Sequence, residues 1–316
     1  MCRKREIEMK ARAHFSTVSG SALLLSLWAL LLLSAVVFAW VKFINANITV
    51  AAEANFGLQA RALAHSGVQI AMNPAITSPT DPLLQQTIAP DRSYRVTLKH
   101  EDGKLNLNWL LQGPVARQNI LKSYLQLRGL KLAEYTTFVD SLLVWIGAPG
   151  SHPSGAQESD NYHPPGRGSL LTLEEIKQVN GSEPLVSQPG WSDDFTLYPQ
   201  NAPINLQYAS SLVLQSLPTA SPISASQAQR LIDYRAGPDK IDGTGDDNPV
   251  KDAATTAQYL NLPASQLTAI AALVTYRAGT TYRAVSVGHA ANRTRQVEVV
   301  FTQGGAQSQI FLWKEF

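Results

Sequence analysis

The chain has little of what catalytic sites and disulfide frameworks are usually built from. Its 316 residues include a single cysteine, Cys2, so no intramolecular disulfide can form, and a cysteine-rich zinc site and thiol catalysis by the body of the protein are excluded. The 6 histidines are scattered and show none of the spacings typical of metal ligands. No nucleophile elbow, phosphate-binding loop or dinucleotide-binding glycine motif stands in a fitting context. We therefore expect a protein that is not an enzyme.

An excess of charge of one sign is also lacking. Lys and Arg number 26 against 24 Asp and Glu, a formal net charge of +2, which argues against a protein built mainly to bind nucleic acid. Two short helices are expected around a turn at residues 218–224, as in a helix-hairpin-helix. That turn lacks the glycine and the basic cluster that phosphate binding needs. We interpret the two helices as packing elements and expect no nucleic-acid partner.

One long apolar run stands near the N-terminus. Residues 21–41, SALLLSLWALLLLSAVVFAWV, carry no charge. Roughly 21 residues at about 1.5 Å each make a helix of about 31 Å, which is enough to cross a bilayer. The segment before Gly20 is basic, and a cationic flank stays on the cytoplasmic side of a membrane. The pattern predicts a single membrane pass with a cytoplasmic N-terminus.

Residues compatible with a helix continue without proline to about Met72, so we expect one rod of about 50 residues with an amphipathic second half. The apolar run is longer than the core of a cleavable secretory signal, which has about 7 to 15 residues. Three interpretations follow from the residues: a secretory signal cut near Ala51 or Ala52, a plain uncleaved anchor, or a processed pilin-type helix.

The leader and the helix together carry a family resemblance. A basic leader ending in Gly20, an apolar stretch opening S-A-L-L-L at Ser21, and a continuous helix before a soluble body resemble the type IV pilins and the pseudopilins of type II secretion. The resemblance implies cleavage by prepilin peptidase between Gly20 and Ser21, and methylation of the new N-terminus. It also implies that the apolar helix is first a membrane anchor and then part of the filament core.

One departure from the family pattern is informative. Most members carry Glu at the fifth mature position, where this chain has Leu25. A carboxylate in apolar surroundings is costly unless it is paired, and in the family it is thought to pair with the N-terminal amine of a neighbouring subunit. A subunit that enters first has no such neighbour. Leu25 therefore suits a subunit at the filament tip. In lacking this Glu, the chain resembles the general secretion pathway protein K family, whose members are large minor pseudopilins.

The soluble body opens with a strand. RSYRVTLKH at residues 92–100 alternates as a strand does, after a proline-bearing connector at residues 79–90. The next stretch, EDGKLNLN, predicts a tight turn and then a hairpin or strand end, with Asn side chains satisfying backbone groups of the turn. The same stretch resembles the internal signature of the protein K family; its residues are Glu101, Asp102, Gly103, Lys104, Leu105, Asn106, Leu107 and Asn108.

Helical spacing dominates the middle of the chain, from Val115 to about Ile270, and three alternating stretches at the C-terminus predict an antiparallel meander. The expected fold class is α+β: a pilin-like fold with a long N-terminal membrane-spanning helix, an antiparallel sheet and a large inserted α-helical domain. The expected segments are a leader (1–20), the N-terminal helix (21–72, membrane span 21–41), the first part of the sheet (73–111), the inserted domain (112–270) and the C-terminal strands (271–316).

An acidic loop at residues 236–249, AGPDKIDGTGDDNP, offers a candidate metal site. Its carboxylates are Asp239, Asp242, Asp246 and Asp247. Hard oxygen ligands on a glycine-bearing loop suit Ca²⁺, although the EF-hand pattern is absent, and a solvated Asp/Gly turn is the alternative. The family binds calcium in its inserted domain, so the resemblance implies structural Ca²⁺ here. A second, weaker candidate is formed by Glu158 and Asp160, next to Gln157 in a loop of about 20 residues.

The residues and the resemblance together predict a non-enzymatic minor pseudopilin that initiates the pseudopilus of a type II secretion system. The resemblance implies a bacterial inner-membrane location with a periplasmic C-terminal domain. It implies as partners the minor pseudopilins of the I and J types, the major pseudopilin, prepilin peptidase and the inner-membrane secretion platform. The alternatives are a minor pilin of a type IV pilus and a single-pass, membrane-anchored periplasmic binding protein or enzyme.

Overall fold

A computed structural model describes residues 19–76, 78–148, 164–199, 202–303 and 308–316. The chain divides into two compact units, residues 1–58 and residues 59–316. Helix α1, Ser19–Ala71, supplies the described part of the first unit and the beginning of the second. Its end at Ala71 agrees with the expected end near Met72. Proline at position 74 cannot donate a backbone hydrogen bond and stands just beyond the last turn.

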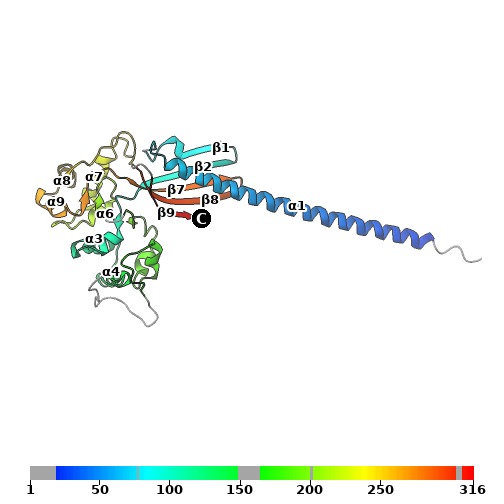
Figure 1. Cartoon of the computed structure of the whole chain (residues 1–316), viewed down its shortest axis with the longest axis horizontal. Helices are drawn as coiled ribbons and strands as arrows, with labels where there is room; N and C mark the ends of the chain where they lie inside the picture. Colours follow the sequence, from blue (N-terminus) through cyan, green and yellow to red (C-terminus); the bar gives the residue numbers. More distant parts are fainter. Residues whose placement is uncertain (1–18, 77, 149–163, 200–201, 304–307) are drawn as a thin grey trace, which may run out of the picture. The chain divides into compact units, whose positions relative to one another are not determined.

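A five-stranded antiparallel sheet organises the second unit (Figure 1). The strand order is β1-β2-β7-β8-β9. The strands are β1 Gln85–Ala89, β2 Arg92–His100, β7 Thr281–Ala290, β8 Arg293–Thr302 and β9 Ile310–Glu315. The predicted strand at residues 92–100 and the three C-terminal strands are confirmed. Strand β1 and the short 3₁₀ helix η1, Pro82–Leu84, correct the prediction that residues 79–90 form only a connector.

The part of α1 that belongs to the second unit, from residue 59 to Ala71, lies on this sheet through a stripe of small residues. Ala60, Ala64 and Gly67 share one face of the helix, and a side-chain carbon added at Gly288 of β7 would collide with the backbone of Ala60 and Ala64. A carbon added at Gly67 would likewise meet Ser286 of β7. Small side chains on both elements therefore allow the helix backbone to approach the strand closely. At the sheet edge, an ion pair of Arg61 Nε with Glu315 Oε2 at 2.7 Å also links α1 to strand β9.

The remaining helices form an insertion between β2 and β7. They are α2 Leu107–Leu111, α3 Val115–Leu127, α4 Leu132–Ile146, η2 Leu173–Gln178, α5 Glu183–Val186, α6 Ser211–Gln215, α7 Ala225–Arg235, α8 Ala253–Leu260 and α9 Ala264–Ile270. Their core is apolar and separate from that of the sheet, with Tyr124, Phe138 and Phe195 among its largest fully buried side chains. The prediction of a mainly helical insertion is confirmed.

Two short parallel strand pairs within the insertion were not predicted. β3, Leu105–Asn106, pairs with β4, Phe195–Thr196, and β5, Ile204–Asn205, pairs with β6, Val274–Thr275. Because each strand has two residues, no alternation in the sequence could reveal it. The pairs tie the first and last segments of the insertion to its middle.

Candidate functional site

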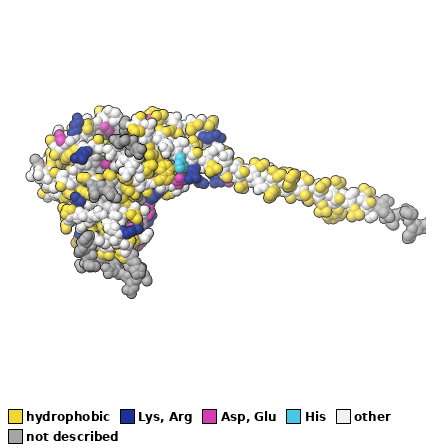
Figure 2. All heavy atoms as spheres, viewed as in Figure 1, with side chains coloured by type: hydrophobic (Ala, Val, Ile, Leu, Met, Phe, Trp, Pro, Cys, Tyr) yellow, Lys and Arg dark blue, Asp and Glu magenta, His cyan; other side chains and the backbone are white. Residues whose placement is uncertain are grey.

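The first candidate site is the apolar helix at the start of the described chain. Gly20 and Ser21 lie in the first turn of α1, and Leu25 follows one turn later with 71% of its surface exposed. Among the described residues, α1 is the helix that is long and apolar enough to cross a membrane, with a mean hydropathy of 2.6 in its most apolar window. Figure 2 shows hydrophobic side chains along its surface. Within its own unit this surface has no covering partner, so it is suited to lipid or to other helices.

Several hydroxyl groups in this helix bond to the helix itself. Ser26 Oγ donates to the carbonyl of Leu23 at 2.8 Å, and Thr49 Oγ1 donates to the carbonyl of Asn45 at 2.9 Å. A hydroxyl without a partner is costly in hydrocarbon, and such a local bond removes that cost. For Ser26 and Thr49, local bonds therefore lower the cost of an apolar environment.

The second candidate site is the signature at residues 101–108, which forms the neck where the chain leaves the sheet for the insertion. Glu101 is fully buried. Its carboxylate accepts two hydrogen bonds from Arg283 of β7, and Lys104 Nζ lies 2.6 Å from its Oε1. Arg283 also pairs with Glu298 of β8. Residues from both sides of the insertion thus meet at one buried ionic cluster.

Electrostatics within this cluster favour the charged forms. Burial alone would raise the pKa of the Glu101 carboxyl, but hydrogen bonds from Arg283 and the charges of Lys104 and Arg283 hold that pKa below its usual value. Burial alone would lower the pKa of Arg283, and its bonds to Glu101 and Glu298 raise it instead. Buried charges persist only when they are paired in this way. The cluster therefore fixes geometry and has no free acid or base for catalysis.

Asp102 and Gly103 bring the insertion close to the neck. Asp102 Oδ2 accepts from the amide of Thr281 at 3.0 Å, and its carbonyl accepts from the amide of Asn205 at 2.9 Å. A side-chain carbon at Gly103 would collide with the backbone of Tyr208. The Tyr208 ring is stacked on His100, with centroids 3.6 Å apart and planes at 15°. The predicted turn is confirmed, and its glycine is required by close contact with a distant segment.

Of the two alternatives predicted after the turn, a hairpin or a strand end, the structure has a two-residue strand, β3, that runs directly into helix α2. Both asparagines bond backbone groups, but these belong to α2 and to distant segments and not to the turn. Asn106 caps α2, since its Oδ1 accepts from the amide of Trp109 at 3.0 Å. Asn108 bonds both backbone groups of Leu170, donating to the carbonyl at 2.9 Å and accepting from the amide at 2.7 Å. Leu105 and Leu107 are buried in the core of the insertion. A polar cap before an apolar run was the signal for a helix here.

The structure places the acidic loop after α7, where its carboxylates bond to nearby donors. Asp242 forms an ion pair with Arg235 at 3.1 Å. Asp239 accepts from the amide of Ile241 at 2.8 Å, and Asp247 accepts from the amide of Gly243 at 2.7 Å. Asp246 accepts from Thr244 Oγ1 at 2.6 Å. The four carboxylates are thus engaged by donors of the loop itself and by Arg235.

The arrangement of this loop does not fit a calcium site. Among the residues that the structure describes, no three His, Cys, Asp or Glu side chains gather into a group that could hold a metal ion. Ca²⁺ needs roughly 6 to 8 oxygen ligands, and the Asp242 carboxylate is engaged by Arg235. Calcium binding stays a prediction of the resemblance. The second candidate pair, Glu158 and Asp160, lies outside the described residues.

Arg283 and Glu298 are the site residues that sequence reasoning missed. Both stand in predicted strands, but Arg283 is 182 positions from Glu101 in the sequence. Alternation identifies the face of a strand and gives no information on such a distant partner. The signal available was a charged residue within a strand that otherwise carries apolar and small side chains.

Among the comparisons with known proteins, the one with solved structures bears on the fold. No protein-family model and no curated protein sequence matches the chain. Among solved structures, the chain is similar to one chain of "The Crystal Structure of the GspK-GspI-GspJ complex from enterotoxigenic Escherichia coli Type 2 Secretion System", with a TM-score of 0.63 and 11% sequence identity. The match covers 85% of this chain and 99% of that chain. The expected α+β, pilin-like fold is confirmed.

Proposed function

We propose that this chain is a minor pseudopilin of a type II secretion system and that it occupies the tip of the pseudopilus. The observation that supports this most directly is the fold similarity, over 85% of the chain, to a member of a pseudopilin complex. A long apolar helix, an antiparallel sheet and a helical insertion occur together in this chain. The charged groups Glu101, Lys104 and Arg283 at the neck are engaged in ion pairs, and this supports a role in assembly.

Leu25 supports the position at the tip. In a filament of pilin-like subunits, a carboxylate at the fifth mature position would need a partner in the apolar core. Leu25 needs none, and it lies on a helix whose surface is apolar from Leu23 to Val41. A subunit without a neighbour above it has no partner for such a carboxylate, so an apolar residue at position 25 avoids an unpaired buried charge. Such a subunit also has room for the insertion, which a subunit stacked beneath another would not.

The proposal includes the following steps. Prepilin peptidase cuts between Gly20 and Ser21, and the new N-terminal amine is methylated. The helix anchors the subunit in the inner membrane, with residues 59–316 in the periplasm. The subunit then associates with minor pseudopilins of the I and J types, with the major pseudopilin and with the inner-membrane secretion platform. The similar structure belongs to a complex of GspK, GspI and GspJ, which supports the first of these associations.

Intact-mass analysis of the full chain from bacterial membranes tests the processing step. We expect a mass that lacks residues 1–20, and we expect G20A to retain them. The control is G57A, a glycine substitution in the same helix that leaves the cleavage bond unchanged. A full-length wild-type chain would indicate a plain anchor, and cleavage beyond residue 45 would contradict the pilin-type helix altogether.

Co-purification tests the assembly step. The processed chain, expressed with the I-type and J-type pseudopilins of the same secretion operon, should elute with them as one complex. Elution of the chain alone, with correct processing, would contradict the role as a tip subunit while leaving the pilin-like class intact.

A further inference from the structure

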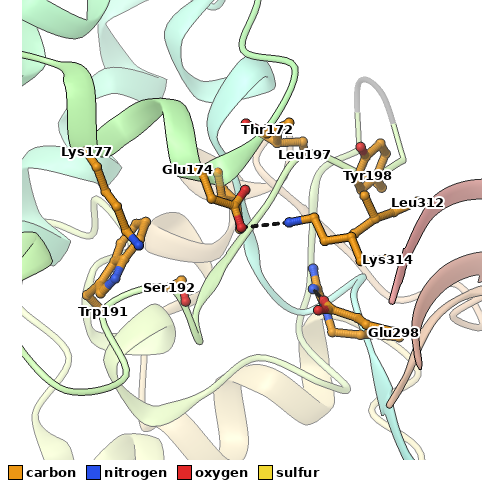
Figure 3. A pocket seen from close by; sticks show the side chains of 12 residues that line it. Thr172, Glu174, Lys177, Trp191, Ser192, Leu197, Tyr198, Glu298, Leu312 and Lys314 are labelled. Carbon is orange, nitrogen blue, oxygen red and sulfur yellow. Dashed lines mark hydrogen bonds and ion pairs between the residues drawn. The ribbon is translucent and has the colours of Figure 1, made fainter. Parts of the chain in front are cut away.

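A small polar pocket lies between the sheet and the insertion, and the functions discussed above do not use it (Figure 3). Its volume is about 190 Å³. Its walls come from η2, from the segment around residues 191–198, and from strands β7, β8 and β9. The charged residues in its lining are Glu174, Lys177, Arg283, Glu298 and Lys314.

Most of these charges are paired with one another. Lys314 Nζ lies 2.6 Å from Glu174 Oε1, the pair drawn as a dashed line in Figure 3. Arg283 pairs with Glu298 and with the buried Glu101. Lys177 makes no ion pair within the part of the chain that the structure describes. The charge of Lys177 also acts on Glu174, but the lining carries three cations (Lys177, Arg283 and Lys314) against two carboxylates (Glu174 and Glu298). This single excess positive charge favours a ligand with a single negative charge.

The uncharged lining suggests the rest of the ligand. Trp191 offers a half-buried indole, and Thr172 and Ser192 add hydroxyl groups to the lining. The two ion pairs present hydrogen-bond donors and acceptors together, as a ring bearing several hydroxyl groups requires. Because pockets for drug-sized ligands occupy about 300 to 1,000 Å³, a pocket of about 190 Å³ has room for one ring.

We propose that this pocket binds a carboxylated monosaccharide, a sugar acid, with its carboxylate at Lys177 and one ring face against Trp191. In Figure 3 Lys177 and Trp191 lie on one side of Glu174, and Lys314 lies on the other. The Glu174–Lys314 pair then forms a wall to which ring hydroxyls bond. This inference rests on residues of the unit 59–316 alone and does not depend on the proposed role in secretion.

Saturation-transfer difference NMR on the full chain in lipid nanodiscs tests the proposal. The probes are D-glucuronate, D-glucose and acetate. We expect D-glucuronate to bind about tenfold more tightly than D-glucose, which lacks the charge, and acetate, which lacks the ring, to bind more weakly than either. K177Q should bring D-glucuronate to the level of D-glucose. K251Q, which removes an exposed lysine outside the pocket, should leave both sugars unchanged.

The possible results separate clearly. No D-glucuronate binding by the wild type, or equal binding by K177Q, overturns the proposal. If acetate binds as tightly as D-glucuronate, the sugar ring contributes nothing to binding. The proposal of a sugar-acid site is then overturned, and the pocket is only a carboxylate site. W191A should abolish binding of both sugars. Because Lys177 is exposed, K177Q does not endanger the fold, and its result stands even if W191A fails to fold.

Discussion

Arg283 binds the buried carboxylate of Glu101 at two points. Its Nε lies 2.8 Å from Oε1 and its Nη2 lies 3.1 Å from Oε2, although the two residues are 182 positions apart in the sequence. Glu101 follows β2 and Arg283 lies in β7. The ion pair thus links the start of the insertion to β7, the strand that follows its end.

Removing the carboxylate should destabilise the protein. E101A leaves the guanidinium of Arg283 partly buried with one fewer acidic partner, and the loss of one member of a buried ion pair costs about 3 kcal/mol or more. Urea unfolding of the detergent-solubilised full chain measures the change in the free energy of unfolding between wild type and E101A. K99Q, an exposed charge change on the neighbouring strand β2, is the control and should change the free energy of unfolding by less than about 0.5 kcal/mol. An E101A value as small as that of the control would contradict the role of the pair.

The same pair should make stability depend on pH. The pKa of Glu101 is lowered in the folded state because its charged partners outweigh the effect of burial. A carboxylate whose pKa is lower in the folded than in the unfolded state stabilises the folded protein. This contribution is complete above the unfolded pKa, about 4.3, and is lost as the pH falls through the folded pKa. The stability difference between wild type and E101Q should therefore be constant near neutral pH and shrink below about pH 4.3. Thermal melting of both proteins from pH 7 to pH 3 measures it, and a constant difference over that range would contradict it.

Two glycines in the chain offer a matched comparison. A methyl group at Gly103 would collide with the backbone of Tyr208 and Ala209, whereas a methyl group at Gly245 would meet nothing within 4 Å. G103A should cost about 1 to 3 kcal/mol of stability, since backbone cannot move aside as a side chain end can. G245A should be close to neutral. Chemical denaturation of both variants measures the difference, and equal effects would mean that the contact at Gly103 is not tight.

Calcium binding by the acidic loop is testable although the loop does not present a formed site. If the loop rearranges to bind Ca²⁺, excess calcium should raise the melting temperature of the full chain by about 3 °C or more, and EDTA should reverse the rise. D246N removes an exposed carboxylate from the loop and should reduce the response. Melting that is the same in EDTA and in excess calcium would rule out the site.

Leu25 is the residue on which the proposed tip position depends. L25E places a carboxylate in the apolar part of α1, and an unpaired charge there would cost about 2 to 3 kcal/mol in a bilayer. We expect lower recovery of the complex with the I-type and J-type pseudopilins and lower secretion by the host system. L25I keeps the position apolar and should behave as the wild type. Normal assembly and secretion with L25E would remove the physical reason for an apolar residue there.

The sequence allowed most of the sheet and both halves of the long helix to be predicted, because their periodic patterns are strong. Strand β1 was missed since QQTIA at residues 85–89 is polar, short and close to prolines, as edge strands often are. The alternation at residues 104–108 predicts a hairpin or a strand end, and the structure has a two-residue strand that is followed at once by helix α2, because the side chain of Asn106 caps that helix.

The candidate sites were less accessible to sequence reasoning. The residues of the neck were identified by their signature, yet their partners Arg283 and Tyr208 come from segments more than 100 positions away. Contacts of this kind depend on the packing of the whole unit, which propensities and local spacing do not encode. The pocket of Figure 3 is missed for the same reason, since its lining comes from residues 172–198 and 283–314.

The ends of the insertion lie opposite each other on neighbouring strands. His100, the last residue of β2, is the register partner of Tyr282 in β7. A tight turn of a few residues could therefore close these two strands into an ordinary hairpin without disturbing the ladder. The helical insertion is in this sense an exchangeable module. It could be removed or replaced by another domain while the pairing of β2 with β7 stays the same.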